Sequence, residues 1–228
     1  MASNPDFQVR LPGPDKRLAI VGSTGSGKTQ AGVFHLGNQD WSDKKRGRPW
    51  YIFDFKGDDL IARLGAQEMS VRAKPVERPG LYVVRPIPEQ DDGWVTELLW
   101  NIWRNENTGI YIDEGYMVGN RNAALNACLT QGRSKRIQMI VLSQRPVWMS
   151  RFVFSEADFF QVFRLNDRRD YDNVQSMISI DVTKRLAPFQ SHWYDVGADR
   201  GVIFNPVPGR RSLIESFRSR SGRNIRAV

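Results

Sequence analysis

The stretch RLAIVGSTGSGKT, residues 17–29, decides the fold of this 228-residue chain. Four of its first five residues are apolar, which predicts a short buried strand, and the residues from Lys28 to about Leu36 then predict a helix. Between them GSTGSGKT, residues 22–29, matches the pattern G-x-x-x-x-G-K-[ST]. A loop of this kind points backbone N–H groups and a helix amino terminus at phosphate oxygens. Its position between a strand and a helix disfavours the alternative, a glycine-rich turn with an ordinary lysine.

The loop therefore predicts a site for the phosphates of ATP. The side chain of Lys28 would reach the β- and γ-phosphates as part of the catalytic site, and the hydroxyl of Thr29 would ligate Mg²⁺. The residues predicted to bind ATP are the eight of the loop: Gly22, Ser23, Thr24, Gly25, Ser26, Gly27, Lys28 and Thr29.

A second apolar run, GIYIDE at residues 109–114, ends in two acids. An aspartate at the end of a strand suits a magnesium-bound triphosphate, because its carboxylate holds the metal through the water shell. We therefore expect Asp113 at the metal and Glu114 as the general base that polarises an attacking water. The alternative is a solvated acidic strand end, which the phosphate loop elsewhere in the chain makes the less favoured interpretation.

The segment TQGRSKRIQMIVLSQRP, residues 130–146, contains a third apolar run that ends in a glutamine. Ligands bind at the carboxyl ends of parallel strands, so Gln144 would lie near the γ-phosphate and orient the water or sense that phosphate. Arg133, in the element before this strand, suits an arginine finger that reaches the nucleotide of a neighbouring subunit. The alternative for Arg133 is a cation at a helix terminus, favoured by the helix dipole.

Apolar runs and helical patterns alternate through most of the chain, which favours an α/β fold with a mostly parallel sheet and helices on both faces. Residues 91–105 show the clearest helical spacing, with apolar positions at i, i+3, i+4, i+7 and i+8 from Val95. HWYDVG and GVIFNP, residues 192–197 and 201–206, predict a terminal β-hairpin. We divide the chain into an amino-terminal arm (1–16), one ATPase domain (17–208) and a basic, partly disordered tail (209–228).

The composition limits the class of partner. A net charge of +8 favours a polyanion, either nucleic acid or an acidic membrane surface, although a solvated basic surface explains the charge equally well. The single cysteine, Cys128, excludes an internal disulfide and indicates a reducing compartment. The two histidines have no partner at metal-ligand spacing. No apolar run approaches the roughly 20 residues of a membrane span, and the amino terminus lacks the apolar core of a signal peptide, so we expect a soluble, unexported protein.

Four motifs taken in order resemble those of one family. GSTGSGKT, IFDFKGD, IYIDE and QGRSKRIQMIVLSQRP are similar to the motifs of the FtsK–HerA superfamily of DNA-pumping ATPases, and the resemblance covers residues 17–165. It assigns Asp54, Lys56 and Gly57 to the second motif of the family. It also supports the finger role of Arg133 and the sensor role of Gln144.

The resemblance implies a RecA-like (ASCE) P-loop fold, a ring of six subunits, and ATP hydrolysis coupled to movement of double-stranded DNA. The chain has only 21 residues before Gly22, and we expect none of the barrel, membrane anchor or DNA-orienting domain of the larger members. It therefore looks like the genome-packaging ATPases of membrane-containing tailless viruses. That likeness implies action in the host cytoplasm or at a virion vertex, with capsid or portal-vertex proteins as further partners.

A DNA pump should hold its track by the phosphates without reading sequence. The residues expected to contact DNA stand in two basic loops and are Lys44, Lys45, Arg46, Lys135 and Arg136, with Arg48 and Arg133 as further candidates. The tail adds Arg210, Arg211, Arg218, Arg220, Arg223 and Arg226. A solubilising or partner-docking role explains these tail arginines as well as DNA contact does.

Three other functions use the same loop. A small-molecule kinase would need an acceptor pocket and a lid, and a DNA-independent ATP switch would dock its basic tail on anionic lipid. A conjugation- or segregation-type DNA pump would share the chemistry but would normally carry an anchor. We favour hydrolysis over phosphate transfer because of Asp113, Glu114 and Gln144.

Overall fold

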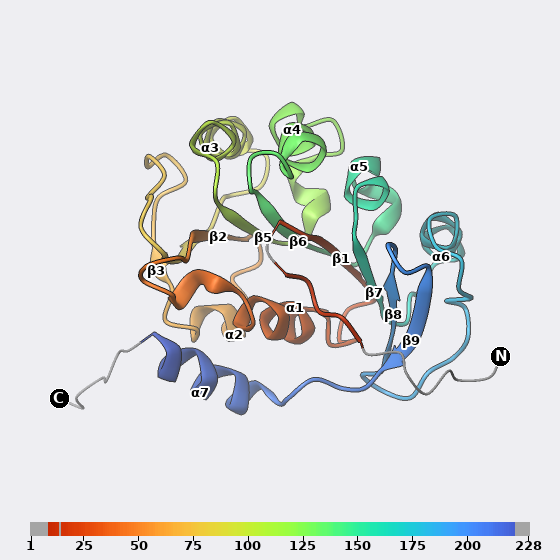
Figure 1. The fold of residues 1–228 in the computed structure, drawn as a ribbon. Helices are drawn as coiled ribbons and strands as arrows, with labels where there is room; N and C mark the ends of the chain where they lie inside the picture. Colours follow the sequence, from red (N-terminus) through yellow and green to blue (C-terminus); the bar gives the residue numbers. More distant parts are fainter. Residues whose placement is uncertain (1–8, 14, 222–228) are drawn as a thin grey trace.

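A computed structural model describes residues 9–13 and 15–221 (Figure 1). Its strands form one sheet in the order β3-β4-β2-β5-β6-β1-β7-β8-β9. They are β1 (Arg17–Val21), β2 (Pro49–Asp54), β3 (Gln67–Glu68), β4 (Gly80–Val84), β5 (Gly109–Asp113), β6 (Gln138–Ser143), β7 (Phe159–Val162), β8 (Ser191–Asp195) and β9 (Arg200–Phe204). Neighbours among β1 to β7 pair in parallel, and β8 and β9 extend the sheet in antiparallel fashion as the predicted hairpin.

Helices cover both faces of the sheet, as the sequence predicts. The α-helices are α1 (Lys28–Gly37), α2 (Asp59–Ala62), α3 (Asp92–Asn105), α4 (Ala123–Gln131), α5 (Arg151–Ser155), α6 (Arg168–Gln175) and α7 (Arg210–Arg220). The described residues also form the short 3₁₀ turns η1 (Asp40–Ser42), η2 (Gly115–Val118) and η3 (Pro146–Trp148). In Figure 1, α3, α4 and α5 lie on one face, and α1, α2 and α7 lie on the other. No helix in the described part of the chain is long and apolar enough to cross a membrane.

Two apolar cores lie on the two faces of the sheet, because successive side chains of a strand point to opposite sides. In β1, Leu18 and Ile20 belong to the core beneath α1, whereas Ala19 and Val21 belong to the core beneath α3 and α4. All five residues of β1 are buried. This explains why the central strands read as continuous apolar runs without alternation.

The strand order gathers the predicted catalytic segments. β6 lies between β1, which leads into the phosphate loop, and β5, which ends at Asp113. Because the three strands are parallel, the loops that follow them meet at one edge of the sheet, which we call the carboxyl edge. A strand inserted between the phosphate-loop strand and the acidic strand is the RecA-like (ASCE) arrangement that the family resemblance implies.

The expectation of a partly disordered tail at residues 209–228 is wrong for residues 210–220. They form α7, which packs against α1. Leu213 and Phe217 are buried, and the ring of Phe217 stacks on Trp41 with centroids 5.3 Å apart. Leu213 and Phe217, four residues apart, make an apolar stripe on an arginine-rich helix, with the partly buried Ile214 beside it, a pattern that composition alone does not reveal. The predicted contacts of Arg223 and Arg226 and most of the predicted amino-terminal arm lie outside the described residues.

Candidate active site

The phosphate loop leaves the carboxyl end of β1 and enters α1. Gly25 and Gly27 have φ angles of 76° and 101°, in the left-handed region that a β-carbon would strain, so the curl of the loop requires glycine there. Lys28 is 6% exposed, and its Nζ donates a hydrogen bond to the carbonyl oxygen of Ser23 at 3.3 Å. The buried Ser26 hydroxyl has no hydrogen-bond partner among the described residues. An unpaired buried hydroxyl fits a cradle that an anion completes.

The two acids lie beside this loop, each 1% exposed. Glu114 Oε1 contacts the ammonium of Lys56 and lies 4.0 Å from Lys28 Nζ. Burial, together with the negative charge of Glu114, raises the pKa of Asp113 to about 7. Burial also lowers the pKa of Lys28, against the attraction of Glu114. Asp113 Oδ1 has no hydrogen-bond partner within the described part of the chain, so this carboxylate is available to a cation.

Gln144 connects Glu114 to the phosphate loop. Its backbone N–H donates to Glu114 Oε2 at 3.1 Å, and its side-chain Oε1 accepts from the hydroxyl of Thr24 at 2.5 Å. Its Nε2 donates to the hydroxyl of Tyr116 at 3.2 Å. The structure therefore brings together the loop, Asp113, Glu114 and Gln144, which the sequence placed on three separate strands.

Two members of this cluster were not given a role from the sequence. Lys56 entered only as part of the IFDFKGD motif, and the structure places its ammonium on the carboxylate of Glu114. Tyr116 follows that acid by two residues and holds the Gln144 amide. The D-x-K-G pattern could have pointed to Lys56, whereas no local pattern distinguishes Tyr116 from a core aromatic.

Arg133 lies at the other edge of the sheet, which we call the amino edge. It follows α4 and precedes β6, its side chain is 64% exposed, and it donates to Asp158 Oδ1 at 2.9 Å just before β7 begins. The six residues of β6, at about 3.3 Å each, separate this edge from the phosphate loop. Arg133 therefore cannot reach the nucleotide of its own subunit.

The predicted DNA-contacting loops also lie at the amino edge. Residues 44–46 precede β2, residues 135 and 136 precede β6, and only β5 separates these two strands. Arg48 joins the two loops by donating to the carbonyl oxygen of Arg136 at 2.7 Å, and it forms ion pairs with Asp15 and Asp40. Because Arg48 is 1% exposed, its interpretation as a DNA contact is wrong.

The remaining basic residues of these loops differ in their contacts and in their exposure to solvent. Lys135 pairs with Glu106 at 2.7 Å and lies 4.0 Å from the centroid of the Trp103 ring, so its position is fixed. The side chains exposed to solvent are those of Lys44, Lys45, Arg46 and Arg136. The structure thus gives one basic edge, far from the phosphate loop, whose contact with DNA stays a prediction.

Comparisons with known proteins agree with this architecture. No family model matches the chain. The chain is 45% identical over 220 residues to the DNA packaging ATPase P9 of Enterobacteria phage PRD1, covering 92% of this chain and 95% of that protein. The fold also resembles the genome packaging NTPase B204 of Sulfolobus turreted icosahedral virus 2, solved with AMPPCP, at a TM-score of 0.68 and 18% identity, covering 86% of this chain and 100% of that one. ATPases 2 and 3 of EssC from Geobacillus thermodenitrificans match at a TM-score of 0.63 and 13% identity, covering 91% of this chain and 44% of that one.

Proposed function

The chain belongs to the family of viral DNA-packaging ATPases, and from this premise we propose that it hydrolyses ATP to move double-stranded DNA into a preformed capsid. The observation that carries the proposal is the set of contacts made by Glu114. Its two carboxylate oxygens contact Lys56 and the backbone N–H of Gln144, and it lies beside Lys28 of the phosphate loop. A buried carboxylate held in this way suits proton abstraction from a water, which a site built only for binding does not need.

The phosphates of ATP lie on residues 22–29, where Lys28 neutralises the β- and γ-phosphates. Thr29 and Asp113 would hold Mg²⁺, and the unpaired oxygen of Asp113 together with a hydroxyl and phosphate oxygens is the ligand set that this ion prefers. The ion supplies neutralisation of the charge on the phosphate oxygens when bound.

Hydrolysis begins when Glu114 accepts a proton from the attacking water. The oxygen of that water bonds to the γ-phosphorus as the bond to the leaving ADP oxygen breaks. Gln144 orients the water or senses the γ-phosphate, because its amide spans from Thr24 of the loop to Tyr116. Loss of the γ-phosphate changes the partners open to Gln144, which offers one route from the chemistry to movement.

We also propose that the chain works as a ring of six subunits. The exposure of Arg133 and its distance from its own phosphate loop support a finger role in trans. The basic loops share the amino edge with Arg133, so DNA contact and neighbour contact arise on one side of each subunit. DNA packaging places such a ring in the host cytoplasm at a virion vertex, with capsid or portal-vertex proteins as partners.

The test is steady-state ATP hydrolysis with and without double-stranded DNA. We expect DNA to raise turnover, and Glu114→Gln to lower it about 10²- to 10⁴-fold while nucleotide binding persists. The matched control is Glu97→Gln, an exposed acid of α3 that should retain full activity. Arg133→Ala subunits mixed into wild type should reduce activity more than dilution does.

Other outcomes would point elsewhere. Hydrolysis that is indifferent to DNA would contradict translocation and favour an ATP switch. Transfer of phosphate to an added small acceptor would favour a kinase. If activity falls only in proportion to the fraction of Arg133→Ala subunits, Arg133 does not act in the active site of the neighbouring subunit.

A further inference from the structure

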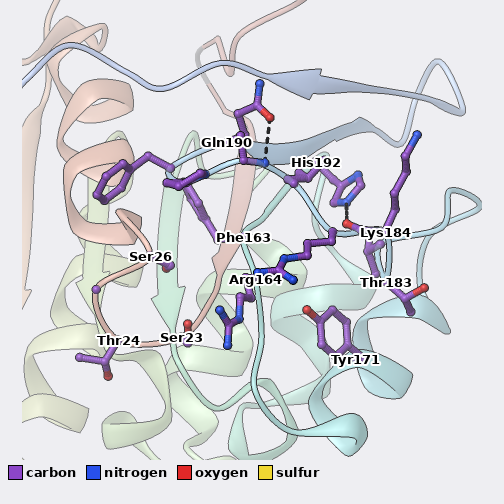
Figure 2. Close-up of a pocket in the computed structure, with 17 residues that line it drawn as sticks. Ser23, Thr24, Ser26, Phe163, Arg164, Tyr171, Thr183, Lys184, Gln190 and His192 are labelled. Atoms are coloured by element: carbon purple, nitrogen blue, oxygen red, sulfur yellow. Dashed lines mark hydrogen bonds between the residues drawn. The ribbon is translucent and has the colours of Figure 1, made fainter.

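A cavity of about 840 Å³ adjoins the phosphate loop and takes no part in the chemistry above. Ser23, Thr24, Gly25 and Ser26 line one side, and the segment 182–190 before β8 lines the other. Figure 2 shows loop residues and residues of this segment around the same space. The cavity lies on the β7 side of β1, whereas Glu114 and Gln144 follow β5 and β6 on the other side. Its volume is in the range of small-molecule sites.

Phe189 is the unusual residue of this segment. Its side chain is 58% exposed, and its φ of 62° lies in the left-handed region, which is unfavourable for a bulky residue. A β-carbon placed on Gly27 would lie 3.3 Å from Phe189 Cδ1, so the ring lies against the last glycine of the phosphate loop. The backbone of Phe189 is strained and its ring is largely exposed to solvent. Packing within this chain therefore does not explain why a phenylalanine stands at this position.

A second cavity, of about 240 Å³, lies on another side of the same ring. Gly27, Gln30 and Phe163 line it together with Phe189 and residues 205–207. Phe189 therefore forms a wall of both spaces that open next to the phosphate loop. A group that extends from phosphates on the loop into either space meets this ring.

We propose that Phe189 stacks on the base of the bound nucleotide and that the segment 182–190 forms its nucleoside subsite. The inference rests on the proposed function, because it takes a nucleotide to be the ligand of residues 22–29. Stacking on an aromatic face tolerates any base, since every base presents a π-face. The amide of Gln190 is already used, accepting from the N–H of Ala187 at 3.1 Å and donating to Asn205 Oδ1 at 3.2 Å. Since stacking itself does not distinguish one base from another, we expect adenine and guanine nucleotides to bind alike.

The experiment compares two ligands that differ only by the nucleoside. Calorimetric titrations with ADP and with inorganic pyrophosphate are made on wild type, Phe189→Ala and Phe189→Trp. We expect Phe189→Ala to raise the Kd of ADP about tenfold, equal to about 1.4 kcal/mol, and to leave the Kd of pyrophosphate within about twofold. Phe189→Trp should bind ADP with the Kd of wild type, because it keeps an aromatic face. The Kd of GDP should change in the same way as that of ADP in each variant. The control is Phe152→Ala, an exposed phenylalanine on α5 that should change neither Kd.

Two results would overturn the subsite. Equal weakening of ADP and pyrophosphate by Phe189→Ala would mean that the ring only supports the loop, and no change in either Kd would mean that the base lies elsewhere. Failure of the proposed function gives a different pattern. Lys28→Ala would then leave the binding of both ligands unchanged, which removes the loop itself as the phosphate site.

Discussion

Protonation of His35 should destabilise this protein below neutral pH, by an amount that the structure sets. His35 lies in the last turn of α1, fully buried, stacked on Trp193 and hydrogen-bonded to Gln161 Oε1 at 2.9 Å. Burial lowers its pKa from 6.5 to about 4, although the bond to Gln161 opposes the shift. Between these two values the unfolded chain holds a proton that the folded chain lacks. The free energy of unfolding therefore rises with pH in this window and is lost as pH falls.

The size follows from the width of the window. Each pH unit is worth about 1.36 kcal/mol, so the whole interval from 6.5 to about 4 corresponds to about 3.4 kcal/mol. Between about pH 7.5 and about pH 5, we expect wild type to lose about 2 kcal/mol from this residue alone. His35→Gln removes the titrating group and keeps an amide near Gln161. Between about pH 7.5 and about pH 5, the free energy of unfolding of His35→Gln should therefore fall by about 2 kcal/mol less than that of wild type. This difference does not depend on how stable the variant is at neutral pH.

The assay is urea unfolding of wild type and His35→Gln at several pH values, analysed as the difference between the two curves. The difference cancels the carboxyl groups that titrate over the same range in both proteins. His192→Gln is the matched control, because the pKa of His192 is lowered by a less complete burial and its effect should be smaller. Parallel pH profiles for wild type and His35→Gln would refute the reasoning, since they would mean that His35 is protonated equally in both states.

Three further predictions concern the fold and the site. Phe217→Ala should lower the free energy of unfolding, measured in urea, by about 3–5 kcal/mol, because it leaves a cavity where α7 packs on Trp41. The side chain of Arg211 is exposed, so Arg211→Ala should change this free energy by less than about 0.5 kcal/mol. Without Mg²⁺, the raised pKa of Asp113 means that the folded chain keeps a proton between about pH 4 and pH 7. Stability should therefore fall as pH rises, on the order of 3 kcal/mol from about pH 5 to about pH 8, and Asp113→Asn should remove that fall in urea titrations. Gly109→Ala would put a β-carbon 2.0 Å from the ring of Trp50 and should lower the melting temperature. Gly93→Ala on α3 meets nothing within 4 Å and should raise the melting temperature, because alanine favours a helix more than glycine does. Equal shifts of the two melting temperatures would contradict the predicted overlap.

The predicted elements that proved correct are those with a strong local pattern. The phosphate loop, the apolar face of α3 and the hairpin of β8 and β9 each carry their periodicity or turn residues within a few positions. The short α5 and the two-residue β3 were missed, because fewer than six residues show no period. The helix α7 was missed because Leu213, Ile214 and Phe217 are the few apolar residues of an arginine-rich segment, and the surface that buries Leu213 and Phe217 belongs to α1 and Trp41.

The sequence by itself determined the chemistry that residues 22–29, Asp113, Glu114 and Gln144 can perform, because side-chain type and position at a strand end are local properties. Tertiary structure alone decided which of them touch. Parallel strands that are neighbours in the sheet, though far apart in the chain, bring their carboxyl ends together and so place the Gln144 N–H on Glu114. The same parallel arrangement places Arg133 at the amino edge, at the end of the strands opposite to its own phosphate loop. Pairing between distant strands depends on long-range contacts that no window of the sequence contains, and for that reason the contacts of Lys56, Tyr116 and Phe189 emerged only from the folded chain.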